Sequence, residues 1–89
     1  MDISDWRSKI DALDEVLVYL LNRRAQYALE IGRIKREQGG EVYSPEREKE
    51  VLGVVQRLNR GPLDNGAIKR VFQKILEESR RLESRDVEG

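Results

Sequence analysis

The strongest restriction on the fold is a run of about 36 residues, Ile3 to Gln38, with no proline and a single glycine. Apolar residues recur in it at steps of three and four, which is the spacing of one helix face. They are Trp6, Ile10, Leu13, Leu17, Leu20, Leu21, Ala28 and Ile31. Such a helix is roughly 54 Å long, whereas a globule of 89 residues is about 30 Å across. Because the overhanging stripe would lie in water, we expect a second copy to cover it in an intertwined homodimer.

Turn residues divide the rest of the chain into two shorter helices. Gly39-Gly40 ends the first helix, and Ser44-Pro45 is typical of an N-cap followed by proline at the first helical position. The second helix is predicted from there to about Asn59, before Gly61-Pro62 interrupts the pattern. Asp64 can cap a third helix with its own apolar stripe.

Composition narrows both the architecture and the chemistry. The length suits one domain, so we expect residues 1–89 to form a single all-α domain of three helices, one long and two shorter, with a fraying tail after Arg85. The chain has no Cys and no His, which excludes disulfides, thiolate and imidazole catalysis, and the usual zinc sites. Its 17 basic and 17 acidic residues cancel, so we expect no nucleic-acid or membrane partner. Without a signal-like N-terminus or an apolar stretch near ~20 residues, a cytoplasmic location is expected.

Polar side chains interrupt the apolar stripes of all three predicted helices. They are Arg24 and Lys35 in the first, Arg47 and Glu48 one turn before the stripe of the second, and Ser79 and Glu83 at the end of the third. Helix periodicity turns these side chains inward, and a buried cation without a partner costs several kcal/mol. The set holds three cations and two carboxyl groups, so a dianionic ligand would complete it.

Each of these residues also has an ordinary structural explanation. A single Arg or Lys in a helix stripe often reaches solvent or sets the register of a dimer. Ser44 can simply cap its helix, and Ser79 can bond back to a carbonyl of its own helix. Arg7 lies off the main stripe, where exposed arginines are common. The coincidence of such residues on three helices is what favours a binding site.

Three segments carry a family resemblance. The segment WRSKIDALDEVLVYLLNRRAQYALEIGRIK contains an arginine, then I-D-x-L-D, L-L-x-R-R and I-G-x-x-K, in that order. The segments VYSPERE and GPLDNGAIKRVFQKILEES follow, and one turn after the final serine comes an acidic residue. Together they resemble the all-helical class of chorismate mutase from about Trp6 to Glu83. Several spaced motifs in the right order make this match specific.

The resemblance implies a cofactor-free, metal-free enzyme of phenylalanine and tyrosine biosynthesis that rearranges chorismate to prephenate. It implies that Arg24 and the partner's Arg7 bind the two carboxylates, that Glu48 binds the ring hydroxyl, and that Lys35 and Glu83 face the ether oxygen. Arg47 and Ser79 would complete the carboxylate-binding wall, and Ser44 is the remaining substrate-binding candidate. Arg7 and Arg24 are 17 positions apart, or roughly 25 Å along one helix. That separation independently favours delivery of Arg7 to the other protomer's pocket.

Two other functions stay open at this point. An isochorismate pyruvate lyase uses a similar helical scaffold and pocket, and a non-catalytic helical dimer could use the inward charges only to set register. The match at Arg24, Lys35, Glu48 and Glu83 favours the mutase.

Overall fold

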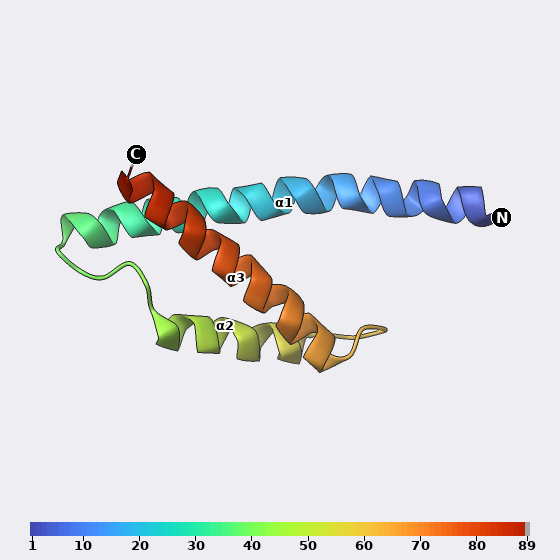
Figure 1. The fold of residues 1–89 in the computed structure, drawn as a ribbon. Helices are drawn as coiled ribbons and strands as arrows, with labels where there is room; N and C mark the ends of the chain where they lie inside the picture. Colours follow the sequence, from blue (N-terminus) through green and yellow to red (C-terminus); the bar gives the residue numbers. More distant parts are fainter. Residues whose placement is uncertain (89) are drawn as a thin grey trace.

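The computed structural model describes residues 1–88 and consists there of three helices without a strand (Figure 1). These are α1 (Ile3–Glu37), α2 (Pro45–Leu58) and α3 (Asn65–Glu88). The predicted all-α fold of one long and two shorter helices is confirmed. The tail after Arg85, which was expected to fray, belongs to α3, which continues to Glu88. Arg85 lies in the last turn of α3, where a cation favours the negative end of the helix dipole.

The predicted boundary residues act at the ends of the helices. Gly39 follows the C-cap of α1 with a φ of 75°, a left-handed conformation that glycine adopts without steric cost. At the start of α2, the Ser44 side chain accepts a hydrogen bond from the backbone nitrogen of Arg47 at 3.2 Å. At the start of α3, an Asp64 carboxylate oxygen accepts one from the backbone nitrogen of Ala67 at 2.7 Å. These local interactions explain why the sequence pattern located the helices.

The chain is elongated, and α1 extends beyond the rest of it. Its dimensions are 56 × 27 × 15 Å and its radius of gyration is 16.1 Å, compared with about 12 Å for a compact chain of this length. Helix α3 packs against both α2 and α1 and ends beside the C-terminal half of α1, while the N-terminal half projects away (Figure 1). The predicted overhang of the first helix is therefore confirmed.

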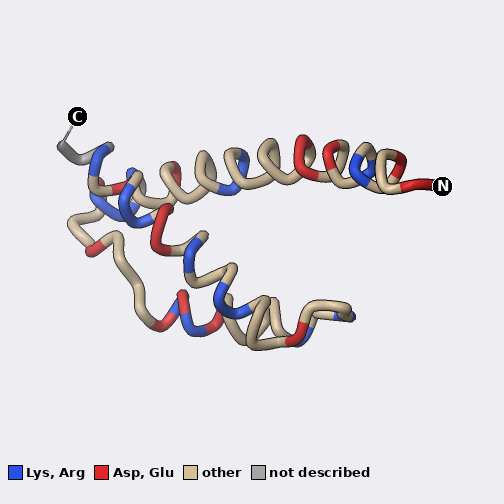
Figure 2. Tube along the Cα trace, turned by 45° about the vertical axis from the view of Figure 1, so that its right-hand side comes forward, with Lys and Arg blue, Asp and Glu red and all other residues tan. Residues whose placement is uncertain are grey.

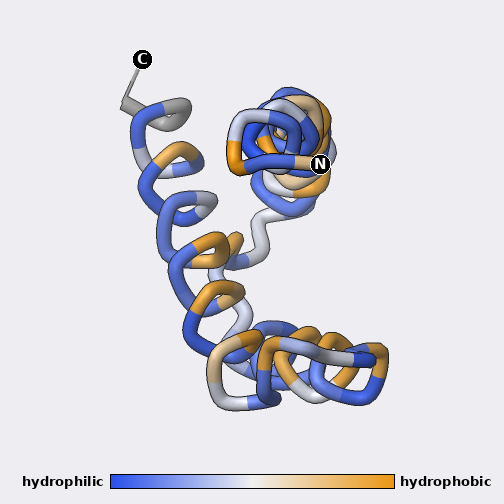
Figure 3. Tube along the Cα trace, turned by 90° about the vertical axis from the view of Figure 1, so that its right-hand side faces the viewer, coloured by the Kyte–Doolittle hydropathy of each residue, from blue (hydrophilic) through white to orange (hydrophobic). Residues whose placement is uncertain are grey.

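The overhanging half of α1 exposes large apolar side chains. Trp6 is 56% exposed and Leu13 is 68% exposed, and Leu76 at 7% is the sole buried hydrophobic residue in the described part of the chain. Apolar segments of α2 and the adjoining half of α3 lie together, whereas α1 stands apart from α2 (Figure 3). A single copy thus has little core of its own.

Charges are mixed along all three helices (Figure 2). Basic and acidic residues are interspersed along the trace of each helix in the described part of the chain. Across the described residues, no helix is both long enough and apolar enough to cross a membrane.

Candidate active site

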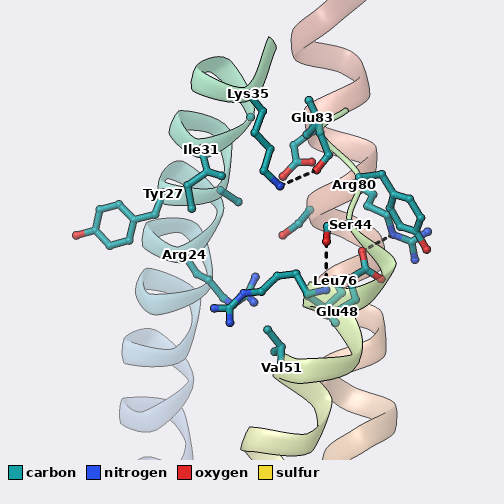
Figure 4. Close-up of a pocket in the computed structure, with 16 residues that line it drawn as sticks. Arg24, Tyr27, Ile31, Lys35, Ser44, Glu48, Val51, Leu76, Arg80 and Glu83 are labelled. Carbon is teal, nitrogen blue, oxygen red and sulfur yellow. Dashed lines mark hydrogen bonds and ion pairs between the residues drawn. The ribbon is translucent and has the colours of Figure 1, made fainter. Parts of the chain in front are cut away.

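A pocket of about 290 Å³ lies where the C-terminal half of α1, the start of α2 and the C-terminal half of α3 meet (Figure 4). This volume is near the lower end of the ~300–1,000 Å³ typical of small-molecule sites. Seven of the eight predicted site residues line it: Arg24, Lys35, Ser44, Arg47, Glu48, Ser79 and Glu83. The eighth, Arg7, lies in the projecting half of α1 and is exposed. The structure therefore brings together residues that are up to 59 positions apart, from Arg24 to Glu83.

One end of the pocket is formed by α1 and α3 around a glycine. Gly32 is the buried residue of α1, and a Cβ atom there would lie 3.3 Å from Val42 Cγ1 and 3.9 Å from Glu83 Cγ. The absence of a side chain at Gly32 lets the α1–α2 loop and α3 approach α1 closely. Lys35, partly buried, donates a hydrogen bond from Nζ to the Val42 carbonyl at 3.4 Å. Lys35 and Glu83 consequently face the same end of the pocket (Figure 4).

The Glu83 carboxyl is electrostatically unusual. Burial raises its pKa above the ordinary 4.5, while the positive charges of Lys35, Arg36 and Arg24 lower it and the nearby Glu48 raises it again. Burial outweighs the cations, so the net shift is upward. Glu83 therefore holds a proton to higher pH than an exposed glutamate does.

Arg24 and Arg47 both line the pocket, but their side chains differ in burial. Arg24 is partly buried on α1. Arg47 touches the pocket, yet its side chain is 65% exposed and its Nη1 lies 2.6 Å from Glu50 Oε1, one turn further along α2. The prediction that Arg47 turns inward needs correction: it lies at the rim, because a long side chain in the first turn can reach a carboxylate at i+3.

Several residues that line the pocket were not predicted from the sequence, among them Arg80 and Tyr43. Arg80 Nε lies 3.0 Å from Glu48 Oε2, and the Arg80 guanidinium carbon lies 5.0 Å from the centroid of the Tyr43 ring. The spacing along α3 could have indicated Arg80, because residues four positions apart lie on the same face of a helix. Arg80 follows Leu76 by four positions, and Leu76 is the most buried apolar residue of α3.

Positive charge is in excess around the cavity. Among the described residues that line it, four are cationic, namely Arg24, Lys35, Arg47 and Arg80, and two are acidic, Glu48 and Glu83. Ile31, Val51 and Leu76 supply apolar wall between them. A compact ligand with two negative charges and a small apolar ring would fit this lining.

Residues 6–84 match the protein family described as chorismate mutase type II. The chain belongs to this family. Among solved chorismate mutases, the form II structure from Thermus thermophilus has a TM-score of 0.90 at 34% identity and covers 93% of this chain and 94% of that one. The chorismate mutase from Helicobacter pylori in complex with prephenate has a TM-score of 0.88 at 29% identity, covering 97% of this chain and 93% of that one. The resemblance predicted from the sequence motifs is confirmed.

Longer relatives of the chorismate mutase family carry a second activity in their names. The bifunctional chorismate mutase/prephenate dehydratase of Pseudomonas aeruginosa is 43% identical over 75 residues, which are 79% of this chain and 20% of that protein. The protein of the same name from Neisseria gonorrhoeae is 44% identical over 72 residues, 81% of this chain and 19% of that one. The chain thus spans about a fifth of the length of these curated relatives.

Proposed function

We propose that this chain rearranges chorismate to prephenate, on the route to phenylalanine and tyrosine. The observation that carries the proposal is the convergence of Arg24, Lys35, Glu48 and Glu83 on one small pocket with surplus positive charge. Family membership and the two chorismate mutase structures with nearly the same fold support it.

The reaction suits these residue types. A Claisen rearrangement is unimolecular and pericyclic, so it requires no nucleophile and no proton transfer. The protein has to hold a flexible dianion in the compact chair in which the reacting carbons meet. It also has to place positive charge and hydrogen-bond donors where negative charge grows on the ether oxygen.

Each pocket residue then has a role. Arg24 binds one substrate carboxylate through its planar fork, and Glu48 accepts a hydrogen bond from the ring hydroxyl. Lys35 and a protonated Glu83 donate hydrogen bonds to the ether oxygen of the breaking C–O bond, a role to which the raised pKa of Glu83 lends support. Arg47 at the rim and Ser79 extend the carboxylate-binding wall. Ser44 borders the ligand while its side chain caps α2.

The active unit in this proposal is a homodimer in which Arg7 reaches the partner's pocket. The exposed stripe of α1 supports it, because leaving each large apolar side chain in water forgoes roughly 1.5–3 kcal/mol. A second hollow of about 200 Å³ shares Arg24, Arg47 and Val51 with the first, and its remaining lining is apolar, namely Val54, Val55 and Phe72. A partner's helix would bury this hollow and the stripe together, and would bring Arg7 to the second carboxylate.

The test is the loss of chorismate absorbance in the purified protein and in Arg24→Ala. The parent should convert chorismate to prephenate, and Arg24→Ala should lose about 100-fold to 1,000-fold in kcat, by analogy with the loss of one preorganised donor. Arg33→Ala is the matched control, because Arg33 is on the same helix, ion-paired with Glu30 and outside the pocket lining.

Two outcomes would point elsewhere. Consumption of isochorismate with release of salicylate and pyruvate, and none of chorismate, would identify a lyase. If neither compound reacts while Arg24→Ala weakens the dimer, the inward charges serve register and the protein is a non-catalytic dimer.

A further inference from the structure

We propose that Arg80 is a positioning residue that holds one oxygen of the Glu48 carboxylate, so that the other oxygen is presented to the substrate's ring hydroxyl, and that Tyr43 holds Arg80 in place. The inference rests on the proposed function, because it assigns a role to Glu48 in substrate binding. Neither Arg80 nor Tyr43 belongs to the set of residues that the sequence motifs assigned to the site.

The contacts define a chain of three side chains from three parts of the fold, and Figure 4 labels two of them, Glu48 and Arg80. Glu48 comes from the first turn of α2, Arg80 from α3, and Tyr43 from the loop between α1 and α2. The Arg80 Nε forms an ion pair with Glu48 Oε2 at 3.0 Å, and the guanidinium carbon lies 5.0 Å from the centre of the Tyr43 ring. At that separation the cation interacts favourably with the face of the ring.

Arg80 is suited to orient a carboxylate. The Glu48 side chain is 21% exposed and the Arg80 side chain is 43% exposed, so the ion pair is partly shielded from the water that weakens surface pairs. The contact engages Oε2 and leaves Oε1 as the acceptor for a ligand hydroxyl. Without Arg80, the glutamate could rotate among several rotamers, and each substrate molecule would have to select the productive one.

Arg80 also adjusts the charge that a dianion meets. The Glu48 carboxylate is a negative charge in the pocket lining, and it would repel an anionic substrate. A guanidinium paired with Glu48 offsets that repulsion without filling the hydrogen-bonding site.

Tyr43 lies at a position that commonly stabilises a helix start. With Ser44 as the N-cap of α2, Tyr43 is the residue before the cap and Glu48 is the fourth helical residue. Apolar residues at these two positions often pack together as a hydrophobic staple. Here the Arg80 side chain bridges the two positions, and it thereby ties the loop before α2 to α3.

Steady-state kinetics of Arg80→Gln on chorismate test the proposal, with Arg81→Gln as the matched control. Arg81 is the next residue on α3, pairs with Glu77 and Glu78, and does not line the pocket. We expect Arg80→Gln to lower kcat/KM about twofold to fivefold, the range of a partly exposed ion pair, and Arg81→Gln to leave it unchanged. In a Glu48→Gln background, Arg80→Gln should cause no further loss, because its effect passes through Glu48.

Loss of the aromatic contact gives a second readout. Tyr43→Leu should lose part of what Arg80→Gln loses, and Tyr43→Phe, which keeps the ring against the guanidinium, should lose less than Tyr43→Leu. Far-UV circular dichroism and thermal unfolding establish that each variant is folded. If Arg80→Gln does not fold, Arg80→Lys replaces it, with a smaller loss expected because the charge remains.

Equal kcat/KM for Arg80→Gln and Arg81→Gln, or additive losses for Arg80→Gln and Glu48→Gln, would overturn the assignment. Failure of the parent to convert chorismate would instead contradict the proposed function. In that case the assignment is judged by calorimetric titration with prephenate: weaker binding to Arg80→Gln than to the parent supports it, and equal or absent binding overturns it.

Discussion

Mixing two inactive variants, Arg7→Ala and Arg24→Ala, decides whether the projecting half of α1 serves a partner's pocket. The two side chains are roughly 25 Å apart along a single helix, and a cavity of about 290 Å³ cannot bring both to one small ligand within one chain. If Arg7 acts across a dimer, each heterodimer contains one pocket with both arginines and one pocket with neither. Random pairing in an equal mixture makes about half of the dimers heterodimers, so about a quarter of the parental activity should return.

The assay unfolds the two proteins together, refolds them and follows chorismate absorbance. The control is a mixture of Arg24→Ala with Lys35→Ala, because both residues line the same pocket from the same chain. No heterodimer of that pair has an intact pocket, so activity should stay at the level of the separate variants. Recovery in the control mixture, or none in the Arg7 and Arg24 mixture, would refute the crossed arrangement of Arg7.

Two further predictions follow from the pocket. Burial raises the pKa of Glu83, and only the protonated acid can donate a hydrogen bond to the ether oxygen, so kcat/KM should be highest below that pKa and fall about tenfold per pH unit above it. Glu83→Gln should remove this fall. Coincident pH–rate profiles of the parent and Glu83→Gln would reject the role of Glu83 as a donor. Ser44→Ala removes the N-cap of α2 and should lower the free energy of unfolding, measured by urea titration, by about 1 kcal/mol. Its kcat/KM on chorismate should change little. Lost activity at unchanged stability would instead show that the Ser44 hydroxyl contacts the substrate.

Site residues could be predicted from the sequence most reliably where they lie on the apolar stripe of a single helix. Arg24 and Lys35 lie on the apolar face of α1, and Glu83 ends the stripe of α3; all three line the pocket. Prediction succeeded there because helix periodicity alone decides which face a side chain occupies. Arg47 shares the first turn of α2 with Glu48 and was predicted to behave alike, but its reach to Glu50 leaves it at the rim. The period of a helix sets a direction from the axis, and it does not set the path of a long side chain.

The order of the residues alone determined the three helices, the overhang of α1 and the family, because caps, apolar spacing and helix rise are local properties. The tertiary structure decided which polar side chains meet. Only it shows that Arg80 reaches Glu48 from another helix, that Tyr43 stacks on Arg80, and that burial of Glu83 outweighs the cations around it. Those outcomes depend on distances between residues far apart in the chain and on how much water is excluded from the pocket. The spacing of residue types along the sequence determines neither quantity.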